Sequence, residues 1–399
     1  MTEIATIEGA PFLNLADPSQ SVRAKPVKQA RDASWYARTP YGLAVLRHSD
    51  MRAMLLHKSL RQGSHAWPAH NDVTGIFADW WGRTVLVKEG ADHARLRKLV
   101  NPAFAPKVVA GLKPDFERMA IELADTFCDR GECDFMADFA DRYAARVLCH
   151  ILGLPIEESD HVLQLSATMG LALGVSFKEN EDRINAATEE MFKYADTLVE
   201  TRKSNPGNDF MSTLVSASED NDRLTNEELR DMILMLVFAG IDTTRNQLGL
   251  GLATFLEHPD QWELLADKPE LAPKAVEEVM RVRPTITWVT REAFEDFEYK
   301  GTAIKKGTTL HLLSECAGTD PNVFPPGFDI TADRERHFGF GGGPHHCLGH
   351  AIARSDMTVA FTILPKRMRN LRTNGEATYL PDSGNTGPIS LPAAFDVAA

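Results

Sequence analysis

The chain has 399 residues, 43% of them apolar, and its 56 acidic residues outnumber the 43 basic ones, which gives a formal net charge of −13. A chain of this size can bury a large core, and its charge excludes a general preference for nucleic acid or for an anionic membrane. The five cysteines include no C-x-x-C pair, which indicates a reducing compartment and argues against a disulfide framework.

The first 29 residues are mixed and polar, without the apolar run of a signal peptide or a membrane anchor. The longest apolar run, over residues 232–241, is far too short to span a bilayer. We therefore expect a soluble, cytoplasmic protein with no membrane partner. No Gly/Ser-rich or Pro-rich linker divides the chain, so we expect a loosely ordered lead-in over residues 1–34 and a single domain over residues 35–399.

The first elements expected are a hairpin and a short helix. Aromatic and β-branched residues alternate with polar ones over residues 34–46, which predicts the hairpin, and residues 51–58 read as the helix. Residues 61–88 are irregular and rich in aromatic side chains, so they form either a core-packing loop or part of a ligand pocket.

A helix is predicted over residues 91–100, before Pro102. His93 and Arg97 lie four residues apart and therefore share one face of it, which on its own is an ordinary basic helix face. Residues 105–204 then read as several amphipathic helices, most of whose apolar surface we expect in the core.

The longest helical pattern begins at a capping box, in which Thr225 is followed three residues later by Glu228, and it continues to about residue 257. Its middle, residues 232–241, is apolar on nearly every side, so this helix is expected inside the protein.

One turn of this helix carries residues that a buried helix does not favour. Gly240 in mid-helix costs about 1 kcal/mol relative to alanine, and a buried carboxylate such as Asp242 costs several unless it has a partner. Both costs at one turn indicate function, although a packing glycine and a threonine, Thr243, that bonds back to its own helix remain the structural alternative. Arg245 follows directly and needs a partner that the sequence does not identify.

A short helix between Pro273 and Pro284 places Glu278 and Arg281 three residues apart on one face. That spacing alone is weak evidence, because it is common by chance. Strand-like alternation follows over residues 285–298. The fold class expected is mainly α with small β-sheets, which we assign to the regions 35–47, 285–315 and 375–395.

Residues 340–349 read F-G-G-G-P-H-H-C-L-G and place Cys347 on a glycine-rich loop just before an apolar helical pattern. Glycine lets the backbone approach a large flat ligand. The N–H groups of such a loop and of the following helix start stabilise a thiolate, and a thiolate on haem iron favours O–O cleavage.

Other interpretations of this loop are weaker. A lone cysteine is usually a small buried apolar residue, but these flanking residues argue for a ligand. A dinucleotide-binding loop needs G-x-G-x-x-G after a strand, whereas here Pro344 interrupts the glycines and residues 333–337 are too charged for a buried strand. A zinc site needs three or four ligands at regular spacing, and no second cysteine is close.

The loop resembles the cysteine-ligand loop of the cytochrome P450 family, F-G-x-G-x-H-x-C-x-G, and every fixed position is filled, by Phe340, Gly341, Gly343, His345, Cys347 and Gly349. Three further motifs precede it in the family's order: H-x-x-x-R, A-G-x-D-T-T and E-x-x-R. The resemblance covers roughly residues 40–395 and implies the mainly helical cytochrome P450 fold with haem b (iron protoporphyrin IX) as cofactor.

The resemblance also implies roles for individual residues. Cys347 would ligate the iron, within a cofactor site that includes Phe340, Gly341 and Gly349. Four residues would hold the haem propionates: His93, Arg97, Arg291 and His345. Ala239 and Gly240 would lie where the central helix distorts to admit dioxygen, and Asp242 and Thr243 would relay protons. Glu278 and Arg281 would form a buried structural ion pair, and the substrate pocket would include Leu236, Ile286 and Val289.

The chain departs from the family pattern at a few places. The family usually completes the E-x-x-R pair with an arginine where this chain has Ala332, and either Arg334 or Arg336 could substitute. Residues 317–321 read A-G-T-D-P where A-N-R-D-P is more common, and Asp356 is a shorter acid than the usual glutamate.

The function implied is monooxygenation, in which one atom of O2 enters a C–H bond of a small apolar substrate of terpenoid, steroid, fatty acid or aromatic type. The electrons would come from a separate ferredoxin and ferredoxin reductase, with a docking patch at Arg95, Lys98, Lys107 and Lys113. A monomer is the default expectation. Two alternatives stay open: a haem-thiolate enzyme that uses peroxide, which would not need the protons of Asp242 and Thr243, and a non-enzymatic haem sensor or ligand carrier.

Overall fold

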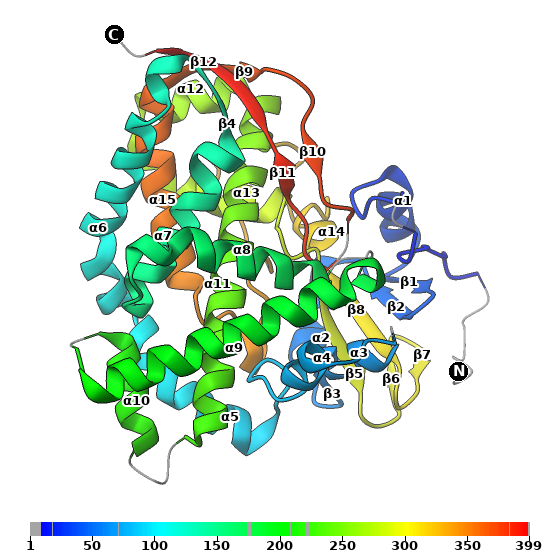
Figure 1. Ribbon diagram of the computed structural model, residues 1–399. Coiled ribbons are helices and arrows are strands. Elements are labelled where there is room, and N and C mark those ends of the chain that lie inside the picture. Colours follow the sequence, from blue (N-terminus) through cyan, green and yellow to red (C-terminus); the bar gives the residue numbers. More distant parts are fainter. Residues whose placement is uncertain are drawn as a thin grey trace.

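The computed structural model describes residues 9–17, 19–70, 72–173, 177–207, 209–219, 224–382 and 384–397. Helices fill most of the molecule, and a strand-rich region lies to one side of them (Figure 1). The mainly α fold with small sheets is confirmed. Within the described residues, no helix combines the length and the apolar character needed to cross a bilayer.

The helices of the described residues are α1 Lys25–Ala33, α2 His48–Leu55, α3 Trp67–His70, α4 Ile76–Trp81, α5 Gly90–Val100, α6 Pro106–Asp125, α7 Asp141–Leu152, α8 Ser159–Gly170, α9 Glu181–Ser204, α10 Phe210–Glu219, α11 Asn226–Glu257, α12 Pro259–Asp267, α13 Ala272–Val282, α14 Ser314–Gly318 and α15 His350–Arg367.

The strands are β1 Tyr36–Thr39, β2 Gly42–Val45, β3 Leu60–Gln62, β4 Glu132–Asp134, β5 Trp288–Ala293, β6 Phe297–Tyr299, β7 Thr302–Ile304, β8 Thr309–Leu313, β9 Met368–Thr373, β10 Thr378–Tyr379, β11 Pro388–Ser390 and β12 Pro392–Val397.

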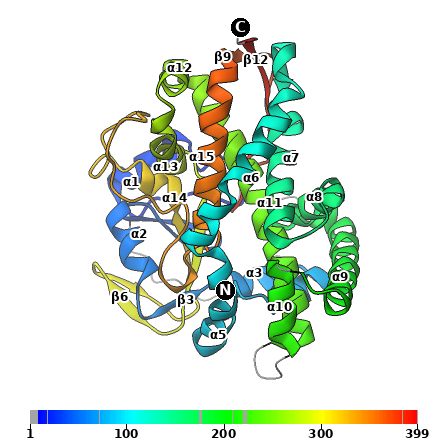
Figure 2. The same cartoon turned by 90° about the vertical axis from the view of Figure 1, so that its left-hand side faces the viewer.

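The long helix α11 runs through the middle of the helical region, as the sequence predicts. Its capping box is present: the Thr225 side chain accepts from the Glu228 N–H at 3.1 Å, and the Glu228 carboxylate accepts from the Thr225 N–H at 3.0 Å. The helix is buried along most of its length and packs against α7, α8, α9 and α13. On one side of the helical region, α15 lies beside α6 (Figure 2).

The largest sheet has the order β1-β2-β8-β5-β3, with β2 and β8 parallel and the other pairs antiparallel. The hairpin β1–β2 and the strand β5 confirm the strand predictions for those two regions. In the register, Arg291 of β5 faces Leu310 of β8 on one side and Gln62 of β3 on the other. The sheet therefore holds Arg291 in its interior, next to the cavity described below.

A second sheet brings together distant parts of the chain, in the order β4-β12-β9. The sequence predicts strands over 375–395, but it misses β4, and β9 begins earlier, at Met368. The short strands β3 and β4 have three residues each, too few for a periodic pattern to reveal them.

The prediction of a loosely ordered lead-in over residues 1–34 is wrong for the part that the structure describes. This part contains helix α1, and Leu13, Leu15 and Val22 are buried in one apolar cluster with residues of the sheet such as Leu313. A few apolar residues without a clear period were enough to dock this segment on the sheet. Whether a domain boundary lies at residue 34 stays a prediction.

Candidate active site

One cavity of about 620 Å³ lies in the middle of the molecule. The loop before α15 contributes Phe340, Gly341 and Cys347 to its wall, and α11 contributes Ala239 and Thr243. Two motifs about a hundred residues apart in the sequence therefore face one cavity.

The cysteine loop is shaped by its own hydrogen bonds and by glycine. The Cys347 N–H donates to the Phe340 carbonyl at 3.0 Å. Gly341 and Gly343 have φ values of +65° and +71°, in the left-handed region that favours glycine. At Gly343 a Cβ would also lie 2.8 Å from the carbonyl oxygen of Leu55. The loop therefore needs glycine both for its backbone angles and for its close approach to α2.

Cys347 lies in the wall of this cavity and is exposed to it. Burial raises the pKa of Cys347, and the N–H groups of Gly349 and His350 oppose this, together with the charges of Arg97 and Arg354. These groups favour the thiolate, which is the form that binds a metal. The start of α15 behind the loop thus has the effect expected from the sequence.

A basic cluster lies next to the loop. Arg97 Nη2 donates to the His346 carbonyl at 2.9 Å, and Arg291 Nη2 donates to the Gly342 carbonyl at 3.3 Å. The rings of His93 and His345 have centroids 4.2 Å apart. Three of the four predicted propionate ligands, His93, Arg97 and His345, line the cavity, whereas Arg291 lies behind the wall.

This cluster is short of negative charge. Burial lowers the pKa of Arg97 and of His93, and it lowers the pKa of Arg291 to about 10. The acid beside them is Glu89, whose Oε1 lies 3.2 Å from His345 Nε2. Within the described residues, neither Arg97 nor Arg291 forms an ion pair with a carboxylate. Two desolvated guanidinium groups that are not paired with a carboxylate fit a ligand that carries carboxylates.

These observations fit haem b. The cavity has a cysteine on a glycine-rich wall, carboxylate-binding groups at one edge and apolar residues such as Leu236 and Val289 elsewhere. A flat, apolar macrocycle with two carboxylates and a thiolate-binding metal matches each of these features.

On the α11 side, the carboxylate of Asp242 has several donors. Arg245 donates to Oδ1 through Nε at 3.0 Å and Nη2 at 2.9 Å. Asn246 and Asn385 donate to Oδ2 through their side-chain amides, the former at 3.4 Å. Arg245 also reaches Asp141 of α7 at 3.1 Å. The partner of Arg245 that the sequence did not identify is therefore a pair of carboxylates, Asp141 and Asp242.

The hydroxyl of Thr243 donates to the Ala239 carbonyl at 2.6 Å, and a Cβ on Gly240 would lie 2.7 Å from Leu148 of α7. The packing glycine and the threonine bonded back to its own helix, which the sequence left as the structural alternative, are thus both present. The helix is continuous from Asn226 to Glu257, and the distortion expected at Ala239 and Gly240 stays a prediction. The four motif residues Ala239, Gly240, Asp242 and Thr243 line the cavity.

The predicted ion pair of α13 is buried: Arg281 Nη2 lies 2.6 Å from Glu278 Oε1, with side-chain exposures of 3% and 2%. Arg334 Nη2 lies 3.1 Å from the same carboxylate oxygen. Of the two candidates for the missing arginine at Ala332, the structure therefore selects Arg334, and Arg336 is exposed.

The predicted substrate-pocket residues Leu236, Ile286 and Val289 all line the cavity. The aromatic stretch over residues 61–88 contributes both to the pocket and to the core. Trp67 and Trp81 line the cavity, whereas Phe77 and Trp80 are fully buried in the core.

Sequence reasoning missed part of the wall. Leu15, Ala16 and Tyr41 come from the N-terminal part, and Asn385 comes from the C-terminal part. Asp356 of α15 also lines the cavity, and neither of its carboxylate oxygens has a partner in the described part of the chain. Burial raises its pKa well above the ordinary value. The sequence marked only Asp356 among these residues, as a shorter acid than the family's usual glutamate, and the tertiary fold brings all of them to the cavity.

Comparisons with known proteins agree with this geometry. The family model for cytochrome P450 matches residues 156–373. The chain is 38% identical over 397 residues to luteothin monooxygenase of Streptomyces thioluteus, covering 97% of each chain. It is 31% identical over 369 residues to mycinamicin IV hydroxylase/epoxidase of Micromonospora griseorubida, covering 90% of this chain and 91% of the relative.

Solved structures show the same fold. The crystal structure of CalO2 matches with a TM-score of 0.89 at 28% identity, covering 96% of this chain and 99% of that one. The structure of P450BioI in complex with an acyl carrier protein matches with a TM-score of 0.86 at 26% identity, covering 94% and 99%. The chain belongs to the cytochrome P450 family and is a haem-thiolate monooxygenase that binds haem b.

Proposed function

We propose that the enzyme inserts one atom of O2 into a C–H bond of a small, largely apolar substrate, and that Asp242 and Thr243 deliver the protons for this reaction. One observation carries the proposal: Cys347 and the Asp242–Thr243 turn line the same cavity. Haem bound through Cys347 supplies the activation of O2. The protein residues bind the haem, exclude water and move protons.

The proposed binding of haem uses charge and shape together. His93, Arg97, Arg291 and His345 would hold the propionates, because burial disfavours their charged forms until carboxylates arrive. Phe340, Gly341 and Gly349 would form the wall against which the macrocycle lies.

Thr243 is suited to pass a proton. Its hydroxyl donates to the Ala239 carbonyl, so its oxygen has a fixed direction and can still accept a hydrogen bond from a group in the cavity. Asp242, in the same helical turn, is a buried carboxylate held by Arg245, Asn246 and Asn385. A proton can therefore move along this turn without opening the cavity to bulk water.

The substrate class follows from the wall. Leu236, Ile286 and Val289 are apolar, which favours a terpenoid, steroid, fatty acid or aromatic substrate. One relative, from Bacillus subtilis strain 168, is named polyketide biosynthesis cytochrome P450 PksS and is 35% identical over 302 residues. That name adds polyketides to the compounds that we would test first.

For the electron supply we propose a ferredoxin and its reductase. Arg97 binds the cysteine loop from α5, so the neighbouring exposed residue Lys98 lies close to the haem side of the molecule. Lys107 on α6 is also exposed, whereas Arg95 is paired with Glu228. Reversing Lys98 and Lys107 to Glu should raise the KM for ferredoxin, and reversing Lys25 on the distant α1 should not.

The proton role is tested by Asp242→Asn and Thr243→Ala, with Thr243→Ser as the matched control. We expect Asp242→Asn and Thr243→Ala each to lower product formed per NADH by about tenfold or more, since positioned proton donors contribute at least that much. Thr243→Ser keeps the hydroxyl and should stay close to wild type. Peroxide-driven turnover that ignores Thr243→Ala would support the peroxide-using alternative. If no substrate gives NADH consumption with any redox partner, the enzymatic role fails.

A further inference from the structure

Asn385 ties the carboxylate of Asp242 to the C-terminal segment of the chain. Its Nδ2 donates to Asp242 Oδ2, across a sequence separation of 143 residues. Both residues are only 4% exposed, so water does not compete strongly for this bond. Arg245 serves the other oxygen of the same carboxylate, so Asp242 is held from two sides.

The orientation of the Asn385 amide is set by its surroundings. Its Oδ1 lies 2.8 Å from the Thr285 hydroxyl, whose one proton is shared with the Thr386 carbonyl at 2.7 Å, so the Asp242 carboxylate decides the orientation. The opposite orientation would turn Oδ1 toward the Asp242 carboxylate, where two acceptors would repel each other. The amide therefore presents its N–H group to Asp242.

The backbone around Asn385 is fixed as well. Asn385 forms an isolated antiparallel bridge with Ile286. On either side of it, the Thr386 N–H donates to the Thr285 carbonyl at 3.0 Å, and the Thr287 N–H donates to the Gly384 carbonyl at 3.2 Å.

This short ladder is joined to α11. The Gln247 side chain accepts from the Thr285 N–H at 2.8 Å. At Gly387 a Cβ would lie 2.5 Å from the Asn246 side chain, so the segment passes very close to the helix there. Asn385 is therefore positioned by α11 itself, next to the acid it holds.

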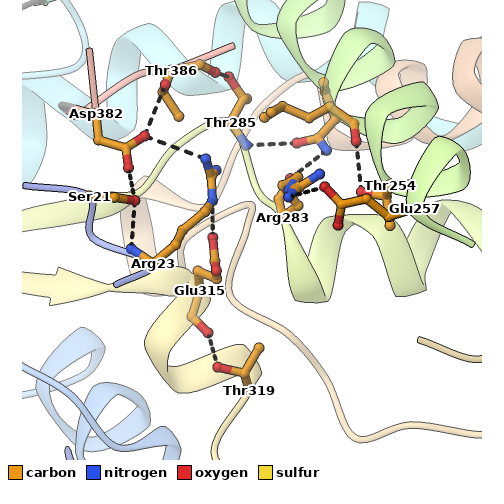
Figure 3. Close-up of polar contacts among 12 residues, drawn as sticks. Ser21, Arg23, Thr254, Glu257, Arg283, Thr285, Glu315, Thr319, Asp382 and Thr386 are labelled. Carbon is orange, nitrogen blue, oxygen red and sulfur yellow. Dashed lines mark hydrogen bonds and ion pairs between the residues drawn. The ribbon is translucent and has the colours of Figure 1, made fainter. Parts of the chain in front are cut away.

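The outer end of the segment is clamped by charged residues of the N-terminal part (Figure 3). Asp382 accepts from the Ser21 hydroxyl and the Thr386 hydroxyl, and it lies 3.4 Å from Arg23 Nη1. Arg23 is also paired with Glu315 at 2.5 Å. Asp382 is thus held by the N-terminal part and also accepts from Thr386, the residue after Asn385, which favours one position for Asn385.

The same segment faces the substrate side of the cavity. Gly384, Asn385, Thr285 and Ile286 all line it. Ile286 is a proposed substrate contact, and Asn385 is its bridge partner. A substrate in contact with Ile286 therefore lies one backbone bridge away from Asn385, the residue that donates to Asp242.

We propose that Asn385 is a positioning residue that fixes the Asp242 carboxylate for proton delivery and links it to the wall that contacts the substrate. This inference rests on the proposed role of Asp242 and adds to it the residue that places the acid.

The test compares the haem-loaded wild type with Asn385→Ala and Asn385→Asp. Each enzyme is assayed with ferredoxin, ferredoxin reductase and a substrate selected because it shifts the spin state of the haem. Asn385→Ala should lower product per NADH by about tenfold, the loss expected for a hydrogen bond to a charged group, and should raise the solvent isotope effect. Asn385→Asp should lose more, because it places a second carboxylate against Asp242. The substrate dissociation constant from the spin-state shift should change by less than about twofold for Asn385→Ala, since an apolar contact surface remains.

The matched control is Asn374→Ala, which removes another asparagine-to-carboxylate bond, to Glu132 at 3.0 Å, on an exposed part of the C-terminal region. This variant should keep wild-type coupling of product to NADH. If it uncouples as much as Asn385→Ala, the effect is not specific to Asp242 and the proposal fails.

A double-mutant cycle with Asp242→Asn separates the two claims. In the Asp242→Asn background, Asn385→Ala should cause little further loss of coupling, and the two decreases in unfolding temperature should be less than additive. If Asp242→Asn uncouples but Asn385→Ala does not, or if their losses add, the positioning role is wrong. If Asp242→Asn itself leaves coupling intact, the proposed function of Asp242 is wrong instead.

Discussion

Arg334 Nη2 lies 3.1 Å from Glu278 Oε1, on the carboxylate that Arg281 already holds at 2.6 Å. Glu278 also accepts from the Asp329 N–H at 3.1 Å. Arg334, two residues after Ala332, thus occupies the place at this carboxylate that the family usually fills from position 332. A side chain with the reach of arginine makes this possible without changing the ion pair of α13.

The first prediction concerns this arginine. Arg334→Ala should destabilise the protein by about 1–3 kcal/mol, because it removes a partly buried hydrogen bond to a charged group. Arg336→Ala is the control, and as an exposed residue it should change stability by less than about 0.5 kcal/mol. Thermal unfolding of both variants checks this, and a larger loss for Arg336→Ala would contradict the assignment.

The second prediction concerns Arg245, which lies between the buried carboxylate of Asp242 and the partly buried carboxylate of Asp141. Burial raises the pKa of Asp141, and Arg245 opposes that rise. In Arg245→Met the folded-state pKa of Asp141 should therefore rise further above its unfolded value of 3.8.

A raised acid pKa destabilises the folded state above that pKa, and the penalty disappears as pH falls toward the unfolded value. The loss of unfolding temperature in Arg245→Met should accordingly be largest above the raised pKa of Asp141 and become smaller as pH falls toward 3.8. Unfolding curves of wild type and variant across this range measure it. A loss that is the same at every pH would mean that the two carboxylates do not depend on Arg245.

The third prediction uses a departure from the family pattern. At Gly318 a Cβ would lie 2.3 Å from the carbonyl oxygen of Arg281, so α14 approaches α13 more closely than a larger residue allows. Gly318→Ala should destabilise the protein by about 1–3 kcal/mol, as other overpacked sites do.

Gly111 in α6 is the matched control, because nothing lies within 4 Å of the Cβ position there. Gly111→Ala should instead stabilise the protein by up to about 1 kcal/mol through helix propensity. Equal effects of the two substitutions on the unfolding temperature would show that the close contact at Gly318 is not important.

The fourth prediction concerns haem binding. Arg291 is buried and has no ion pair among the residues described, and burial lowers its pKa to about 10. If it holds a propionate, Arg291→Met should weaken haem binding by about 10- to 100-fold, the range for a hydrogen bond to a charged group. The exposed Arg61, on the neighbouring strand β3 and paired with Glu292 at 2.8 Å, is the control. Haem titration of both variants distinguishes them, and equal affinities would remove Arg291 from the site.

Local patterns predicted the parts of this molecule that local forces determine. The capping box at Thr225, the length of α11 and the E-x-x-R pair of α13 all depend on residues within a few turns of one another. The motifs around Cys347 and Asp242 could likewise be found by spacing alone, because each lies within one loop or one helical turn.

Long-range contacts were not predictable in this way. Arg245 meets Asp141 across a separation of 104 residues, and Asn385 meets Asp242 across 143. Neither partner carries a periodic pattern, and many other polar residues could have filled the same role. The docking of Leu13 and Leu15 on the sheet was missed for the same reason, since their burial depends on strands that lie far away in the sequence.

The most direct test of the account is the absorption spectrum of the reduced protein with carbon monoxide, recorded beside Cys347→Ser. A haem with a thiolate ligand from Cys347 should give a strongly red-shifted Soret band in the wild type, and the shift should be absent from the folded serine variant. An unshifted band from folded wild-type protein, or a red shift that survives in Cys347→Ser, would contradict the assignment of Cys347 as the ligand on which the proposed site is built.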